Sequence, residues 1–99
     1  MFEEYKKLIK EASQRVYAVA KLTDLDYATQ LSLRHNNKIW LKREDQQSVF
    51  SYKIRGAYNL IASLSKSERD RGVIAASAGN HAQGVALAAK HLNLKSIIV

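Results

Sequence analysis

The chain has 99 residues, of which 46% are hydrophobic and 25% charged, so it is an ordinary globular sequence rather than a disordered one. It has no cysteine, which excludes disulfides, cysteine-ligated zinc and thiol catalysis. No apolar run approaches the roughly 18 residues that a membrane span needs. The N-terminal segment carries three glutamates and no cleavage pattern, unlike a signal or transit peptide. We therefore expect no membrane partner and a reducing, cytoplasmic location.

The formal net charge is +7, from sixteen basic and nine acidic residues, and such an excess raises nucleic acid as a partner. The basic residues are scattered, however, and the densest run, Lys38 to Arg43, is followed at once by Glu44 and Asp45. No aromatic stacking motif accompanies them. We expect a solvated surface and no nucleic-acid partner, and keep a small basic nucleic-acid-binding domain as an alternative.

Apolar residues at alternating spacings of three and four predict an N-terminal helix. They are Phe2, Tyr5, Ile9, Ala12, Val16 and Val19. The mixed stretch from Thr23 to Asn37 predicts a short helix that ends in a loop at Asn36. A strand is expected over Lys38 to Lys42, followed by an irregular polar segment as far as Ser51.

The second half of the chain alternates helices and strands. Ser51 is the expected N-cap of a helix with an apolar face from Ile54 to Leu64. Ser65 and Glu68 have the spacing of a capping box, which predicts a short helix before Gly72. The remaining expected elements are a strand over residues 73–76, a turn over 77–80, a helix over 82–92 with a left-handed cap at Asn93, and a strand over 96–99.

Strands that alternate with helices indicate an α/β fold with parallel strands and right-handed crossovers. No repeat or linker divides the chain. The last predicted strand reaches Val99, and nothing follows to cover the second face of its sheet. We therefore expect residues 1–99 to form one truncated part of a larger α/β domain.

Lys53 falls in the first turn of a predicted helix, where a cation opposes the positive end of the helix dipole. One interpretation is a solvated surface lysine whose unfavourable interaction with the helix dipole is screened by solvent. The other is functional, because an amine that is favoured in its neutral form can make a Schiff base with a carbonyl cofactor. The local sequence leaves both open.

The segment Ser77-Ala78-Gly79-Asn80-His81 follows a strand and opens a helix, which is where ligands bind in open α/β sheets. Free N–H groups at a helix start can hold an anion, Gly79 permits close approach, and Asn80 can donate or accept. A plain N-capping turn is the alternative. His81 alone is more often a structural partner than a base, and the dispersed histidines predict no metal site.

The adjacent carboxylates Glu44 and Asp45 could serve as an acid/base pair, but we prefer a role in salt bridges or loop capping.

Two segments make the sequence recognisable: KREDQQSVFSYKIRGAY at residues 42–58 and ASAGNHAQGVA at residues 76–86. Together they resemble the threonine ammonia-lyases, pyridoxal-phosphate-dependent threonine dehydratases of the tryptophan-synthase-β-like family. The resemblance extends from about Val16 to Val99. It implies the N-terminal part of a fold-type II, three-layer αβα catalytic domain. It also implies the cofactor pyridoxal 5'-phosphate, the amino-acid substrates threonine and serine, and a homo-oligomeric parent enzyme.

The resemblance also implies roles for individual residues. Lys53 matches the lysine that holds the cofactor covalently and later moves protons, and Tyr52 stands beside the cofactor ring where the family usually has Phe. Asn80 matches the asparagine that hydrogen-bonds the ring hydroxyl. Residues 77–81 match the loop whose N–H groups hold the substrate carboxylate. Ala78 stands where related serine racemases have a second serine that acts as a base, which implies elimination rather than racemisation.

The activity implied is β-elimination of L-threonine to 2-oxobutanoate and ammonia. Residues 43–45 with Gln47 and Val49 resemble the biosynthetic enzymes of the isoleucine pathway more than the catabolic ones. The chain departs from the family pattern at Asp24 and Ser48, where the family usually has proline, and at Asn93, where it has glycine.

In the family, the phosphate cradle and the partner of the pyridine nitrogen lie beyond position 99, so we expect the short chain alone to be inactive. The alternatives that stay open are a non-catalytic truncated remnant and a catabolic serine/threonine dehydratase.

Overall fold

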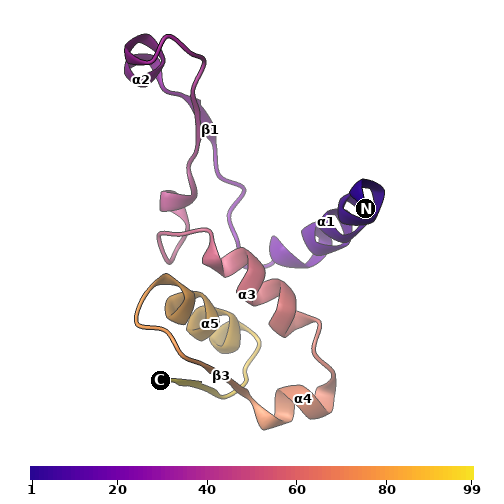
Figure 1. Cartoon of the computed structure of the whole chain (residues 1–99). Coiled ribbons are helices and arrows are strands. Elements are labelled where there is room, and N and C mark those ends of the chain that lie inside the picture. Colours follow the sequence, from indigo (N-terminus) through magenta and orange to yellow (C-terminus); the bar gives the residue numbers. More distant parts are fainter.

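The computed structural model describes all of residues 1–99. Figure 1 shows a helix that projects on one side, an arm that stands away from the body, and a body of packed helices and strands. No helix is both long and apolar enough to cross a membrane. The elements in chain order are α1 (Phe2–Val16), β1 (Leu25–Tyr27), α2 (Thr29–Arg34), β2 (Trp40–Lys42), the 3-10 turn η1 (Glu44–Gln46), α3 (Lys53–Ala62), α4 (Lys66–Arg71), β3 (Val73–Ala75), α5 (Asn80–His91) and β4 (Ser96–Ile98).

The body contains a parallel strand pair, as expected for strands joined by a helix. Strands β3 and β4 pair in parallel, with Ile74 opposite Ile97, and α5 connects them. The β3 strand covers Val73–Ala75 and so ends one residue before the expected Ala76. The loop that follows β3 therefore starts at the carboxyl end of a parallel strand, where ligand sites of α/β proteins form.

The arm differs from the prediction. Strand β2 is shorter than the expected Lys38 to Lys42 and pairs antiparallel with β1, so the expectation that all strands share parallel pairing is wrong for this strand. The strand Leu25–Tyr27 was not predicted, because three residues are too few to show a period of two. Pairing across the loop that contains α2 forms it, and the rings of Tyr27 and Trp40 meet edge to face at 5.0 Å.

The helix limits follow their capping chemistry. The predicted capping box is confirmed, because the Ser65 hydroxyl accepts from the Glu68 N–H while the Glu68 carboxylate accepts from the Ser65 N–H. The left-handed Asn93 is confirmed as well, with φ at 55°. Ser51 is not the N-cap of α3: Tyr52 occupies that position, and the Ser51 hydroxyl accepts from the N–H of Lys53 at 3.3 Å.

Two other helices begin or end at residues that differ from the prediction. Helix α1 ends at Val16 rather than near Val19, since i to i−3 bonds tighten residues 17–19 into a turn. Helix α5 begins at Asn80, two residues before the expected start.

The apolar core lies where α3 and α5 pack together, beside the end of α1. On α3 the apolar stripe predicted from the sequence is buried, with Ile54 only 1% exposed. On α5 the facing side chains are small, and Ala88 is fully buried. Small residues let two helix backbones come close, so this packing sets the position of the first turn of each helix. The nine core residues are Val16, Ala20, Ile54, Ala57, Tyr58, Ile61, Ala75, Val85 and Ala88.

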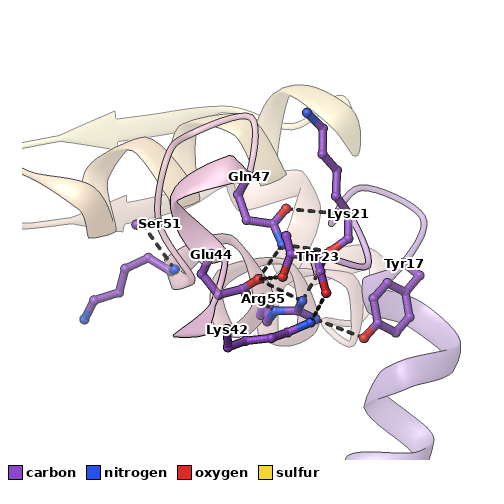
Figure 2. A network of polar contacts seen from close by, with 9 residues as sticks. Tyr17, Lys21, Thr23, Lys42, Glu44, Gln47, Ser51 and Arg55 are labelled. Carbon is purple, nitrogen blue, oxygen red and sulfur yellow. Dashed lines mark hydrogen bonds and ion pairs between the residues drawn. The ribbon is translucent and has the colours of Figure 1, made fainter. Parts of the chain in front are cut away.

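A polar cluster fixes the start of α3 from the opposite side (Figure 2). The guanidinium of Arg55 pairs with the carboxylate of Glu44, and the hydroxyl of Thr23 donates to the same carboxylate. The Arg55 hydrogen bond holds the pKa of Glu44 at about 2, below its ordinary 4.5, with help from Thr23 and Gln47 and against the opposing effect of burial. Glu44 is therefore a fixed anion that pairs with Arg55 near the start of α3.

Gln47 ties the same cluster to the segment after α1. Its side chain is 1% exposed, and its amide bonds both the N–H of Lys21 at 2.9 Å and the carbonyl of Lys21 at 2.8 Å. Arg55 donates to the same carbonyl at 3.2 Å and to the hydroxyl of Tyr17 at 3.1 Å. The cluster thus connects two chain segments, the one after α1 and the one around η1, to the start of α3.

We predict that Glu44→Gln lowers the free energy of unfolding by about 2 kcal/mol at neutral pH, because it leaves Arg55 without its partner. A carboxyl whose folded pKa is depressed contributes stability above its unfolded pKa and loses it as the pH falls. The wild type should therefore lose this contribution between about pH 4.5 and pH 2, and the variant should not. Urea unfolding followed by circular dichroism over that range measures it.

The matched control is Glu4→Gln, at an exposed glutamate of α1 that forms no ion pair. Equal unfolding free energies for the two variants would contradict the assignment of Glu44 as the anchor of this cluster.

Candidate functional site

Lys53 is the first residue of α3 and is half-buried. Its backbone N–H is held by Ser51, but its side-chain amine enters none of the six ion pairs of the chain and makes no hydrogen bond. The amine lies over the ring of Tyr52, whose centroid is 5.4 Å from Nζ. The structure therefore leaves this amine free to react while an aromatic ring lies beside it.

The loop after β3 has a second set of free groups. The hydroxyl of Ser77 accepts from the N–H groups of Gly79 at 3.2 Å and of Ala82 at 3.3 Å, which closes the turn. The N–H groups of Ala78, Asn80 and His81 donate to no protein group. A Cβ built at Gly79 meets nothing within 4 Å, so the loop is open on that side. Three free donors at the start of a helix suit a carboxylate or another anion.

The two polar side chains of this loop are also free. Asn80 and His81 are both exposed, and neither side chain makes a hydrogen bond within the chain. An amide can donate and accept at the same time, whereas a lone exposed imidazole has no partner here that would orient it. Asn80 is therefore able to bind a polar ligand atom, while nothing in the structure gives His81 a specific role.

Gly84 brings these two parts of the chain together. A Cβ at Gly84 would lie 3.1 Å from both the carbonyl carbon and the carbonyl oxygen of Lys53, so the two helix backbones touch there. Asn80 precedes Gly84 by four residues and shares its side of α5. The first turn of α3, with its free amine, and the first turn of α5, with its free N–H groups, consequently lie next to each other.

The carboxylates considered as an acid/base pair are not placed for that work. Glu44 is held ionised by Arg55, and Asp45 pairs with Arg43 at 2.9 Å. The hydrogen bond from Arg43 also lowers the pKa of Asp45. The preferred interpretation of both residues as salt-bridge partners is confirmed.

Sequence reasoning missed two features beside Lys53. A glycine inside a helix lowers helix stability by about 1 kcal/mol relative to alanine. Gly84 within α5 could therefore have been read as a sign that another backbone approaches closely there. Phe50, three residues before the lysine, has a left-handed backbone with φ at 60°, which bulky residues rarely adopt. No sequence pattern predicts that conformation, because it depends on the path of the loop between Gln47 and α3.

Residues 17–99 match the family described as pyridoxal-phosphate dependent enzyme. The L-threonine dehydratase biosynthetic IlvA of Haemophilus influenzae is 55% identical over 96 residues, which cover 97% of this chain and 19% of that protein. The corresponding protein of Pasteurella multocida is 56% identical, over 97% of this chain and 18% of its own length. The chain thus spans about a fifth of the length of these relatives.

Solved structures agree with this relationship. The processed form of threonine deaminase isoform 2 from Solanum lycopersicum superposes with a TM-score of 0.86 at 48% identity, over 97% of this chain and 27% of that one. Maize serine racemase superposes with a TM-score of 0.85 at 36% identity, over 91% of this chain and 28% of that one. These neighbours confirm the expected α/β fold class, fold-type II. Residues 17–99, with the free amine of Lys53 and the open loop before α5, belong to the family of pyridoxal-phosphate-dependent enzymes.

Proposed function

We propose that residues 1–99 are the N-terminal part of the catalytic domain of a biosynthetic threonine ammonia-lyase, which converts L-threonine to 2-oxobutanoate and ammonia on the route to isoleucine. The observation that carries the proposal is the contact at Gly84, which sets the free amine of Lys53 next to the open loop of residues 77–81. The identity to biosynthetic threonine dehydratases over 97% of the chain supports the choice of reaction. The natural protein that carries these residues is called the full-length protein below.

The residues present fit the reacting end of pyridoxal phosphate. An aldehyde needs a primary amine without a competing partner, and Lys53 offers one. The exposed ring of Tyr52 can lie against a flat heterocycle, and the free amide of Asn80 can bond a ring hydroxyl. When bound, the cofactor supplies an electron sink for the bonds at the substrate α-carbon.

The protein groups then divide the remaining work. The free N–H groups of Ala78, Asn80 and His81 bind the substrate carboxylate and thereby orient the α-carbon. With the cofactor in place, Nζ of Lys53 would be the group that takes the α-proton and returns a proton to the departing hydroxyl. Ala78 has only a methyl group, so this position provides no second base, which favours elimination over racemisation.

Serine racemisation is the competing function, since a serine racemase is among the structural neighbours. A racemase must deliver a proton to the opposite face of the α-carbon, and a methyl side chain at Ala78 has none to deliver. Amino-acid substrates are common to both functions. A homo-oligomeric assembly and a cytoplasmic location remain predictions from the sequence.

We predict that Lys53 carries the cofactor in the full-length protein. Borohydride reduction followed by peptide mapping should find the pyridoxyl group on this lysine, and Lys53→Ala should abolish it. Lys66→Ala is the matched control, because Lys66 is also the first residue of a helix but pairs with Asp70. Finding the adduct on a different lysine would refute the assignment.

We also predict that the full-length protein eliminates ammonia from threonine, accepts serine less well and racemises serine little. The extra methyl group of threonine adds apolar contact in the site. The methyl side chain of Ala78 cannot donate the second proton that racemisation needs. Formation of 2-oxobutanoate and the enantiomeric composition of serine measure the two activities. Efficient racemisation of serine is the outcome that contradicts this prediction.

Residues 1–99 alone should show no turnover and bind the cofactor weakly. The groups that hold the phosphate and face the pyridine nitrogen are expected outside this segment, and positioning accounts for several kcal/mol of barrier lowering. Ile74 and Ile97, which pair across β3 and β4, are 71% and 61% exposed, so this segment alone should also aggregate. The test adds pyridoxal phosphate and threonine to the 99-residue chain; turnover that Lys53→Ala abolishes would overturn the prediction.

A further inference from the structure

We infer that Gly84 is a positioning residue: it sets the spacing between the amine-bearing turn of α3 and the loop of residues 77–81. This inference rests on the proposed function, because the spacing matters only if Lys53 and the loop act on one ligand. The observation is steric. A Cβ at Gly84 would lie 3.1 Å from the carbonyl carbon and oxygen of Lys53 and 3.2 Å from the N atom of Ile54.

All three of these atoms belong to the backbone of α3. A flexible side chain could rotate away from an added methyl group, but a helix backbone cannot. The contact is tighter than ordinary van der Waals distance, so α3 and α5 would have to separate by a few tenths of an ångström. The separation would occur at Lys53 itself, since two of the three atoms are its own.

The location of the contact makes it specific to the site. Lys53 is the first residue of α3, and Asn80 opens α5 one turn before Gly84. Elsewhere the interface contains apolar side chains, such as Ile61 and Val85, that keep the two helix backbones apart. A methyl group at residue 84 therefore acts on the ends of the helices that carry the reactive groups, and less on the core that holds the fold.

Gly56 provides a matched control within the same helix pair. It lies inside α3, as Gly84 lies inside α5, but a Cβ built there meets nothing within 4 Å. A change from glycine to alanine at either position gives the same gain in helix propensity. Only the change at residue 84 adds a methyl group between the two backbones.

The experiment compares Gly84→Ala and Gly56→Ala with the wild type in the full-length protein. The rate at which the apo-protein forms the borohydride-trappable adduct at Lys53 is measured per folded molecule, with the folded fraction taken from circular dichroism. Threonine kcat and KM and the pH midpoint of the visible absorption of the bound cofactor are measured in parallel. Since a misplacement of about 1 Å costs roughly 100-fold in rate, a few tenths of an ångström should lower kcat by about fourfold.

We expect Gly84→Ala to fold, to form the adduct more slowly, to shift the pH midpoint and to lose about fourfold in kcat, while Gly56→Ala matches the wild type in all four. A pH midpoint and an adduct rate equal to those of the wild type would overturn the inference. So would a Gly84→Ala protein that does not fold, because the glycine would then serve the fold rather than the spacing.

A second comparison separates positioning of the amine from a general structural effect. In the Lys53→Ala background, added methylamine supplies an amine that is not tied to α3. Gly84→Ala should cost clearly less activity there than in the presence of Lys53, and an equal loss in both backgrounds would refute positioning. A wild-type protein without an adduct at Lys53 would overturn the proposed function as a whole. If the wild type forms the adduct and Gly84→Ala has the same adduct rate and pH midpoint, only the inference about Gly84 is overturned.

Discussion

The contact between the backbones of α3 and α5 at Gly84 is the constraint on which the candidate site depends. Two helices ordinarily pack through their side chains, which keeps their axes some 8–10 Å apart. Here one residue without a Cβ lets α5 touch the carbonyl of Lys53 directly. The buried Ile54 and the fully buried Ala88 hold the same interface closed. The loop before α5 and the amine on α3 owe their proximity to this packing, because they are far apart in the sequence.

A second support acts on the other side of the same turn. The carboxylate of Glu44 binds Arg55, and Gln47 and Arg55 both bond the backbone of Lys21. The apolar interface thus fixes α3 toward α5, while the polar cluster fixes it toward the segment after α1. Neither support involves the side chain of Lys53, which is why that amine is free although its backbone is held on two sides.

The sequence predicted those parts of this arrangement that depend on residues close together in the chain. The apolar spacing of Ile54 and its neighbours gave α3, and the Ser65 and Glu68 pair gave the start of α4, because both signals lie within a few residues. The strand Leu25–Tyr27 was missed, since it exists only through pairing with β2 across the helix-containing arm. Lys53 and residues 77–81 stood out as unusual residue types in their local context, but the contact that joins them is a tertiary feature that no single segment encodes.

The placement of both functional segments at helix starts gives the site a common electrostatic character. Unpaired N–H groups and aligned peptide dipoles make the start of a helix favourable for an anion and unfavourable for a cation. Elimination at the α-carbon of an amino acid needs a carboxylate held in place and an amine able to take up a proton. In the proposed function, the free donors of Ala78, Asn80 and His81 meet the first need, and the unpaired amine of Lys53 meets the second. On that proposal, two adjacent helix starts bind an amino acid by its carboxylate and act on its α-proton, and the contact at Gly84 is what makes the two starts adjacent.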